Sequence, residues 1–483
     1  MGQATMTNWI LERDDQQLAW LSLDKAGSST NVLSSEVLKE LDQAINTLQE
    51  DLPKALIIRS AKENGFCAGA DVQEFTQITS YDQAYTHIRS AQAVFDRLEN
   101  LKCPTLCLIH GFCLGGGLEL AVACDFRIAE ENDGTRIGLP EVKLGIHPGY
   151  AGSVRLTRLI GSPAAMQMIL SGRTISGKQA ARNGVVSHAV PQRLLESAAV
   201  QFLKRPPRRP RARGWKQLTN SALIRPILAR LIRRSLMNKI RSDHYPAPYA
   251  QLDVWQRYGG NPQRMQLAEA ESVARLIVGS VAQNLIRLFF LQTRLKDEAR
   301  VSNYSPTHVH VVGAGIMGGD IAAWCALKGM KVTLQDRDIQ SIAPAIKRAN
   351  RLFNKKLRNK YDKQHVSDLL IPDVNGYGVR HADIIIEAVF EDLAAKQELF
   401  SRLEADARPD AILASNTSSL RLEQIAEVMQ DPGRLVGIHF FNPVAQMQLV
   451  EIVYAKQTQH SLARQAAAFV RHIGKLPLMV KSS

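Results

Sequence analysis

Short apolar runs alternate with amphipathic segments over residues 1–190. The runs 55–58 and 105–109 are apolar, short and bounded by polar residues, which is typical of buried strands. Residues 34–50 and 82–100 repeat apolar side chains at helical spacing and are predicted helices. This alternation predicts an α/β domain.

A second alternation of strands and helices begins near residue 307 and continues to 480. Its first strand, 307–312, runs into a glycine-rich turn, and a helix over 321–328 follows. The residues between the two alternations have a mostly helical and basic pattern, broken by a proline-rich run at 204–213. Proline removes a backbone donor and blocks helix, so this run is a predicted loop or linker. The pattern predicts three parts, 1–190, 191–304 and 305–483.

Length and composition agree with a multidomain protein. A chain of 483 residues exceeds what one hydrophobic core usually supports, and 45% hydrophobic residues is an ordinary share. No apolar run reaches eighteen residues, and the first residues do not have the basic-then-apolar order of a secretory leader. None of the six cysteines has the paired spacing of a zinc site. We therefore expect a cytoplasmic protein with free thiols, without a transmembrane segment or a metal.

A glycine run and two glutamates form the first candidate site. Gly115-Gly116-Gly117 precedes the apolar segment 118–124, which predicts a helix start whose unpaired N–H groups can hold an oxyanion. Glu119 falls in the first turns of that helix, and Glu141 follows a Gly-Leu-Pro turn. Either glutamate alone fits a helix-start acid or a surface turn. Together they predict the addition of water to a double bond conjugated to a thioester, because two carboxylates can divide acid and base roles.

Three stretches of the first part resemble the crotonase (enoyl-CoA hydratase/isomerase) superfamily. They are FCAGADV (66–72), HGFCLGGGLELAVACDFRIA (110–129) and GLPEVKLGIHPGYAGSVRLTRLIG (138–161). The resemblance implies a ββα spiral fold, an oxyanion hole from the N–H groups of Ala70 and Gly116, and catalytic roles for Glu119 and Glu141. Relatives that only isomerise double bonds often keep one acid, so the pair implies hydration. Isomerisation of 3-enoyl-CoA in the same pocket stays open.

A dinucleotide fingerprint marks the second candidate site. Gly313, Gly315 and Gly318 follow a predicted strand and open a predicted helix. A second predicted strand ends at Asp336, near the spacing expected for the acid that bonds the ribose hydroxyls. An acid there repels a 2′-phosphate, so the pattern favours NAD over NADP, although the neighbouring Arg337 weakens that preference.

A histidine and a glutamate further along fit oxidation of a secondary alcohol. Such an enzyme must remove the hydroxyl proton, which His439 can do while Glu451 orients it. The stretches GAGIMGGDIA, SNTSSL and GIHFFNPVAQMQLVEIV make residues 307–480 similar to the NAD-binding domain of L-3-hydroxyacyl-CoA dehydrogenase. The resemblance implies a Rossmann-type fold, with His439 as base and Glu451 as its partner, and with Ser418 and Asn442 contacting substrate or orienting the nicotinamide. It places these residues along the NAD site: Met317, Asp336, Val389, Phe390, Glu391 and Lys396.

The joined architecture resembles the α subunits of bacterial fatty-acid oxidation complexes, including a linker helix over 260–296. This implies a bifunctional enzyme that hydrates 2-enoyl-CoA and oxidises the 3-hydroxyacyl-CoA product, with acyl-CoA substrates and a thiolase β subunit as partner. In that family a helical domain follows the NAD domain, and this chain ends at Ser483, where that domain would begin. We therefore keep an alternative: a hydratase or isomerase whose truncated dehydrogenase half binds NAD but is inactive.

The net charge of +14 leaves one further interpretation, a scaffold or nucleic-acid binder. The run 204–213 is basic but has no interleaved aromatic residues or RNA-binding motif. The phosphates of coenzyme A give a simpler reason for basic surface. We expect no nucleic-acid partner.

Overall fold

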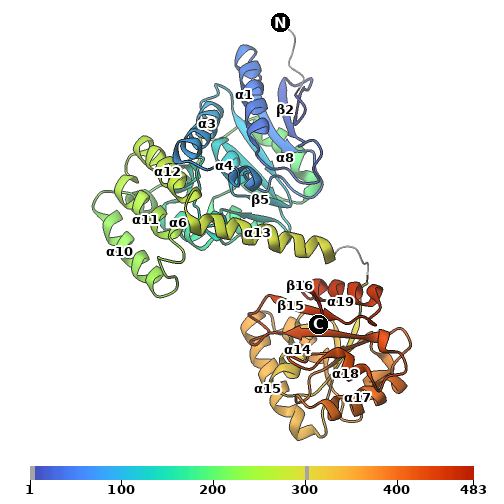
Figure 1. Cartoon of the computed structure of the whole chain (residues 1–483). Coiled ribbons are helices and arrows are strands. Elements are labelled where there is room, and N and C mark those ends of the chain that lie inside the picture. Colours follow the sequence, from blue (N-terminus) through green and yellow to red (C-terminus); the bar gives the residue numbers. More distant parts are fainter. Residues whose placement is uncertain (1–5, 300–303, 483) are drawn as a thin grey trace. The chain divides into compact units, whose positions relative to one another are not determined.

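The computed structural model describes residues 6–299 and 304–482, and the chain divides into two compact units, Met1–Phe289 and Phe290–Ser483 (Figure 1). Residues 300–303 of the predicted linker and the outermost residues, 1–5 and 483, lie outside the described part.

A six-stranded sheet forms the centre of the first unit, in the order β1-β2-β3-β4-β6-β8. Strands β1 and β2 are antiparallel, and the other neighbours are parallel. Residues on β3 and β4 are buried on both faces, which agrees with their continuous apolar pattern. The strands of this unit are β1 Trp9–Arg13, β2 Leu18–Leu23, β3 Ala55–Ser60, β4 Thr105–Ile109, β5 Phe112–Leu114, β6 Phe126–Glu130, β7 Arg136–Gly138 and β8 His188–Val190.

Helices pack around this sheet and around the small β5–β7 pair (Figure 1). The helix predicted at 34–50 runs from Ser35 to Glu50, and the Ser34 side chain caps it by accepting from Val37 N. The helices are α1 Ser35–Glu50, α2 Val72–Phe75, α3 Tyr81–Glu99, α4 Gly116–Ala123, α5 Gly152–Ile160, α6 Ser162–Ser171, α7 Gly177–Asn183, α8 Leu195–Leu203, α9 Trp215–Leu218, α10 Ile224–Met237, α11 Ala247–Tyr258 and α12 Pro262–Ile277. Short 3₁₀ segments are η1 Glu141–Leu144 and η2 Gln192–Leu194.

The residues after 190 continue the first unit. Helices α10, α11 and α12 pack on one another, and α12 packs on α3. The single linker helix expected over 260–296 is wrong, because α12 ends before Val278 and Gly279, and α13 Ser280–Glu298 starts afresh at an angle of 69°. Glycine at this break lowers helix propensity and permits the bend. The basic run 204–213 lies between α8 and α9 and is a loop, as predicted.

An eight-stranded sheet forms the second unit, in the order β11-β10-β9-β12-β13-β14-β15-β16. Strands β11 to β14 are parallel, and β15 is antiparallel to β14. The order reverses at β9, which pairs with both β10 and β12, so the carboxyl ends of these strands flank a switch point where α/β sheets bind ligands.

Helices accompany this sheet, and a buried core lies under α14, α15 and α19. The strands are β9 His308–Val312, β10 Lys331–Gln335, β11 Leu370–Pro372, β12 Ile384–Glu387, β13 Ile412–Ser415, β14 Leu435–Phe440, β15 Leu449–Tyr454 and β16 Leu476–Lys481. The helices are α14 Ile316–Leu327, α15 Ile339–Lys356, α16 Lys360–Asp368, α17 Leu393–Asp406, α18 Leu422–Ala426 and α19 His460–His472, with 3₁₀ segments η4 Tyr377–His381 and η5 Pro432–Arg434.

No single helix of the described residues has the length and apolar composition of a membrane span. The bent pair α12 and α13 passes this test only when its two helices are taken together.

Candidate active sites

A cavity in the first unit brings together all four site residues predicted there. Ala70, Gly116, Glu119 and Glu141 line it, together with apolar side chains and Tyr150. These residues come from separate segments of the chain, so the fold assembles what the sequence spreads over some seventy residues.

Two backbone amides lie close together in the wall of this cavity. Leu33 pairs with the segment at Ala70 through Leu33 N to Gly69 O and Asp71 N to Leu33 O, which turns the Ala70 N–H to the other side. A Cβ built on Gly116 would lie 3.2 Å from Ala70 N, so the two amides are close. Gly116 is the first residue of α4, where N–H groups have no helical partner and the helix dipole is positive. This pair has the chemistry of an oxyanion hole.

Glycine is required in two places around these amides. Gly115 has φ 52° and Gly69 has φ 107°, conformations that L side chains rarely adopt. A Cβ on Gly117 would also meet Cys67 O at 2.7 Å. The glycine run therefore fixes the close approach of α4 to the Cys67–Ala70 segment.

Glu119 is buried on α4 and held by a neighbouring loop. Its Oε1 accepts hydrogen bonds from Tyr150 N and Gly152 N, both at 2.8 Å. Burial raises the pKa of Glu119 to about 7, against the opposite effect of these two hydrogen bonds. Glu119 therefore changes protonation near neutral pH.

Glu141 opens η1 on the facing side of the cavity. Both carboxylate oxygens are buried and have no hydrogen-bond partner within the described residues. Burial, and then the charge of Glu119, raise the pKa of Glu141 well above its ordinary value. The two glutamates thus differ: Glu119 has donors that stabilise an anion, whereas Glu141 has an environment that keeps its proton.

A third glutamate, Glu269 on α12, was not predicted from the sequence. Its Oε1 accepts from Ala151 N at 2.6 Å, and its Oε2 accepts from the Ser153 hydroxyl. It is fully buried, and burial, followed by the charge of Glu119, raises its pKa to about 8. Glu119 and Glu269 therefore hold alternate residues of one loop, 150–153, from two sides. The sequence signal was only an acid on a predicted linker helix.

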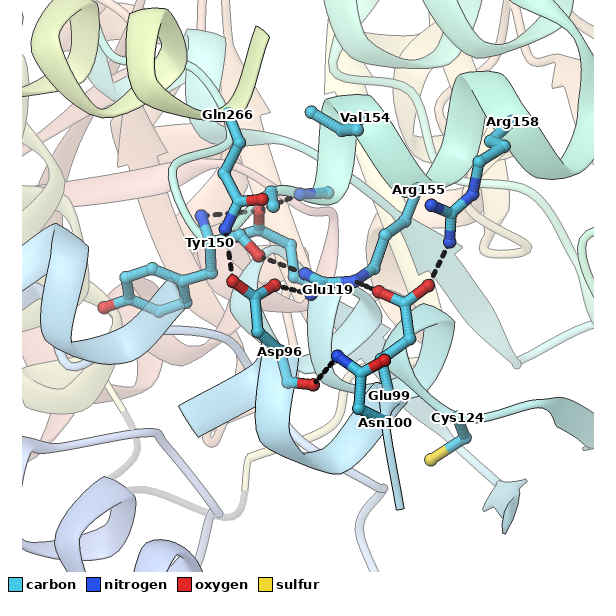
Figure 2. A network of polar contacts seen from close by, with 12 residues as sticks. Asp96, Glu99, Asn100, Glu119, Cys124, Tyr150, Val154, Arg155, Arg158 and Gln266 are labelled. Carbon is cyan, nitrogen blue, oxygen red and sulfur yellow. Dashed lines mark hydrogen bonds and ion pairs between the residues drawn. The ribbon is translucent and has the colours of Figure 1, made fainter. Parts of the chain in front are cut away.

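A buried arginine on α5 also holds the loop 150–153 in place. Arg155 on α5 donates from Nη1 to Tyr150 O at 2.8 Å, from Nε to Glu99 and from Nη2 to Asp96. Figure 2 shows this network between α3 and the loop, with Gln266 of α12 bonded to Asp96. Because Arg155 is only 3% exposed, its two carboxylate partners are needed to keep its charge satisfied.

In the second unit the predicted glycine turn joins β9 to α14. Gly313 has φ 100°, and a Cβ on Gly318 would clash with Gly313 O at 1.9 Å. A Cβ on Gly315 would meet nothing within 4 Å, so open space lies beside this turn at the N-terminus of α14. Asp336 follows β10 and accepts from Ala314 N at 2.7 Å. Open space, free helix amides and an acid at the next strand suit the pyrophosphate and ribose of NAD.

A buried ion-paired cluster follows β12. Lys396, 1% exposed, donates to Glu387, which also accepts from Val389 N and Ser415 Oγ. The second partner of Lys396 is Glu391, at 3.3 Å. Glu387 was not among the predicted residues, although it ends an apolar strand pattern where a lone acid is unusual.

Glu391 also holds the loop after β13. One of its oxygens accepts from Thr417 Oγ1 at 2.6 Å and from Ser418 N at 2.9 Å. Partial burial opposes ionisation, but the hydrogen bonds and the Lys396 charge lower the pKa of Glu391 to about 2. The predicted residues Glu391, Lys396 and Ser418 are thus brought into one network.

The predicted histidine and its partner lie opposite each other on antiparallel strands. His439 on β14 pairs with Glu451 on β15 in the sheet register, and Nδ1 lies 2.9 Å from Oε2. This contact leaves Nε2 as the ring nitrogen for a substrate proton. Asn416 accepts from Phe440 N next to His439, a positioning contact that the sequence analysis did not identify.

The other predicted residues of this unit differ in their exposure. Phe390 is 73% exposed, and Asn442 is also exposed, while Met317 and Val389 are half-buried. Within the described residues no group of three or more His, Cys, Asp or Glu side chains could hold a metal. All six cysteines are buried and free.

Comparison with known proteins gives matches to both units. Residues 16–225 match the family described as enoyl-CoA hydratase/isomerase, and residues 308–483 match the 3-hydroxyacyl-CoA dehydrogenase NAD binding domain. The chain is 35% identical to fatty acid oxidation complex subunit alpha of Vibrio vulnificus, over 98% of this chain and 68% of that protein. The counterpart from Aliivibrio fischeri is also 35% identical, over 98% and 70%. An enoyl-CoA hydratase/carnithine racemase structure from Magnetospirillum magneticum covers 42% of this chain and 74% of its own, with 27% identity and a TM-score of 0.39.

Proposed function

The chain belongs to the family of fatty acid oxidation complex alpha subunits, and on this basis we propose how its own residues perform the two activities. It is an enoyl-CoA hydratase and an NAD-dependent 3-hydroxyacyl-CoA dehydrogenase. The product of hydration is the substrate of oxidation, so the two sites catalyse successive steps. The assembled His439–Glu451 pair favours this bifunctional interpretation over a hydratase with an inactive second half.

For hydration we assign the base to Glu119 and the acid to Glu141. An ionised Glu119, stabilised by Tyr150 N and Gly152 N, takes a proton from water as the water oxygen bonds to the β-carbon. The thioester oxygen gains negative charge, which the amides of Ala70 and Gly116 stabilise. Glu141 then gives its proton to the α-carbon, and the two glutamates exchange protons with solvent to restore the starting state.

The opposite assignment is less favourable. An ionised Glu141 would have neither a donor nor a cation in contact, whereas Glu119 has two donors. An ionised glutamate of this pair would take a proton from the α-carbon of a 3-enoyl-CoA and return it to the γ-carbon, while the amides of Ala70 and Gly116 stabilise the enolate between the two transfers, so we propose isomerisation as a side activity of the same cavity.

We propose Glu269 as a positioning residue for Glu119. It bonds Ala151 N and Ser153 Oγ, and the amides on either side of Ala151 bond Glu119. Ala151 has φ 66°, an uncommon conformation for a residue with a side chain, so the loop needs external support. Glu269 supplies that support from α12.

For oxidation we assign His439 as the base for the 3-hydroxyl proton and Glu451 as its positioning partner. The carboxylate fixes the ring and stabilises the imidazolium that forms. Bound NAD supplies the hydride acceptor. We propose that Gly313, Gly315 and Gly318 admit its pyrophosphate to the α14 N-terminus and that Asp336 bonds its ribose.

We propose that the remaining predicted residues complete these pockets. Met317, Val389 and Phe390 would contact the dinucleotide, and Lys396 and Glu391 would shape the loop that carries Ser418. Ser418 and Asn442 would contact the acyl-CoA or orient the nicotinamide.

The family also implies a partner. As an alpha subunit the chain has a beta subunit in its complex, and we propose a thiolase, because a thiolase consumes the 3-ketoacyl-CoA that the second site forms. The six free cysteines support a reducing, cytoplasmic location as a proposal. We also propose 1–190, 191–304 and 305–483 as three functional parts of the chain, although residues 191–289 pack with the first part in one compact unit.

The coexistence of both assembled sites carries this function. It is tested by adding 2-enoyl-CoA to the full chain, following loss of the conjugated thioester absorbance, and then adding NAD and following NADH. Loss of the enoyl band followed by NADH is expected. Loss of the band without NADH would leave the hydratase alone, and absence of both signals would overturn the assignment.

A further inference from the structure

One stretch of the first unit holds nearly all of the net charge of the chain. Residues 197–242 contain thirteen Lys and Arg side chains and no Asp or Glu, against +14 for the whole chain. Arg209 and Arg233 form ion pairs with Asp125 and Asp253. Nine others form no ion pair with any described residue: Lys204, Arg205, Arg208, Arg211, Arg213, Lys216, Arg230, Arg234 and Lys239.

The same stretch exposes large apolar side chains. Leu223 is 84% exposed, Ile227 63% and Leu231 59%, and their spacing of four residues places them along one side of α10. Arg230 and Arg234 fall beside this row at helical spacing. Four further exposed apolar side chains belong to the same stretch: Trp215, Leu218, Ile224 and Met237. We call the exposed side of α9 and α10 the basic–apolar face.

The fold holds α10 firmly from behind. Ala229 and Leu236 are buried, and the buried Arg225 donates to Gln256 O and Asn220 O. Figure 1 shows α10 at the outer edge of the first unit. An apolar groove also opens beside it, lined by Leu228, Leu231 and Ile232 of α10 and by residues of α6. The exposure is thus a property of a packed helix, and neither assigned active site uses this face.

We propose that the basic–apolar face docks on a membrane surface rich in anionic phospholipids. Helices that lie in such interfaces combine an aliphatic row with flanking cations, because the aliphatic groups enter the acyl boundary while the cations meet phosphate head groups. Nucleic acid would use the cations but leave Leu223, Ile227 and Leu231 in water. The charge complementarity and the aliphatic row together fit a lipid surface.

Sedimentation of the full chain with vesicles tests the proposal. Vesicles of phosphatidylcholine mixed with phosphatidylglycerol should bind the chain, and vesicles of phosphatidylcholine alone should bind it at least about tenfold more weakly. Binding to the anionic vesicles should weaken as salt is raised, because salt screens exposed charges.

Two double variants separate the two components. Ile227→Ser with Leu231→Ser, and Arg230→Gln with Arg234→Gln, should each weaken vesicle binding about tenfold while hydratase activity is retained. The matched controls Leu267→Ser on α12 and Arg402→Gln on α17 replace exposed side chains of other helices and should bind as the parent does.

Three results would overturn the proposal. The first is absence of binding to anionic vesicles, and the second is binding that neither double variant weakens. The third is that the parent binds no vesicles while analytical ultracentrifugation shows a lower molecular mass for the Ile227→Ser, Leu231→Ser variant than for the parent. The last result would make the face a contact between copies. Binding to duplex DNA that is as tight as vesicle binding and independent of Ile227 and Leu231 would assign the cations to nucleic acid instead.

Discussion

Each unit has glutamates beside its site, but the two groups have opposite electrostatic surroundings. Glu119, Glu141 and Glu269 form no ion pair with a Lys or Arg of the described residues, and the pKa of each is raised. Glu387 and Glu391 instead contact the buried amine of Lys396, and the pKa of Glu391 is lowered. A buried carboxylate without a cation holds its proton, whereas one beside a cation stays ionised.

The charge beside each carboxylate therefore decides which of them can transfer protons. In the first unit, protonation near neutral pH gives an acid and a base within one cavity, which hydration requires. In the second unit the ion-paired cluster of Glu387, Glu391 and Lys396 orders the loops at Val389 and Ser418. Proton transfer in this unit is assigned to His439. Five substitutions test this difference.

Selective loss of either the hydratase or the dehydrogenase activity should be the strongest effect. Glu141→Gln should lower the hydratase rate about 10³-fold, because an amide cannot give a proton to the α-carbon. NADH formation from 3-hydroxyacyl-CoA should be unchanged. His439→Gln should do the reverse, which makes each variant the folding control of the other. Parallel loss of both activities in either variant would contradict separate sites.

Next in size is the removal of the buried cation. Lys396→Met should destabilise the second unit by about 3–5 kcal/mol, because Glu387 would remain buried beside an apolar side chain. Urea unfolding followed by circular dichroism measures this loss. Lys347→Met on α15, an exposed position, is the control and should change stability by less than about 0.5 kcal/mol. An equally small change for Lys396→Met would contradict a stabilising ion pair between Lys396 and Glu387.

A smaller effect is expected for the partner of the histidine. Glu451→Gln keeps the size of the side chain and an acceptor for Nδ1 but removes the charge that stabilises the imidazolium. The dehydrogenase kcat should fall by about ten- to a hundredfold with little change in KM. A rise in KM at unchanged kcat would instead assign Glu451 to substrate binding.

The sequence predicted most of both sites, since their motifs are local. Gly115–Gly117 with Glu119, and Gly313–Gly318 with Asp336, are each a strand–turn–helix unit whose geometry depends on nearby residues. Glu141 and Glu451 were proposed from their residue types, and the family resemblance supported their roles, but their distances to Glu119 and His439 depend on tertiary packing. The resemblance also suggested a continuous helix over 260–296, but the chain breaks it at Gly279.

The sequence could not predict the residues that position a site by bonding the backbone of a distant segment. Glu269 reaches Ala151 across 118 positions, and Asn416 reaches Phe440 across 24. Their side chains bond main-chain amides. Because nearly every residue type has such an amide, these contacts do not restrict the residue type of the partner and cannot be recognised in the sequence. Such contacts follow from packing of whole helices and strands and are visible only in the fold.

The effect of replacing Glu269 should be smaller still, because Glu269→Gln removes a titratable group near Glu119 and Glu141 but keeps the size of the side chain. Burial raises the pKa of Glu269 to about 8, so the folded chain holds a proton there that the unfolded chain releases near pH 4.5. Stability should therefore fall as pH rises from about 5 to 8, and Glu269→Gln should make this fall shallower by up to about 1.4 kcal/mol per pH unit. Urea unfolding across this pH range measures the slope. Glu271→Gln, on the exposed side of the same helix, is the control and should leave this slope unchanged.

In the hydratase assay the alkaline limb of the pH profile of Glu269→Gln should move to lower pH, because a negative charge at Glu269 is one of the causes that keep the proton on Glu141. A variant that only loosened loop 150–153 would lower the rate equally at every pH, and that result would leave Glu269 with a structural role alone.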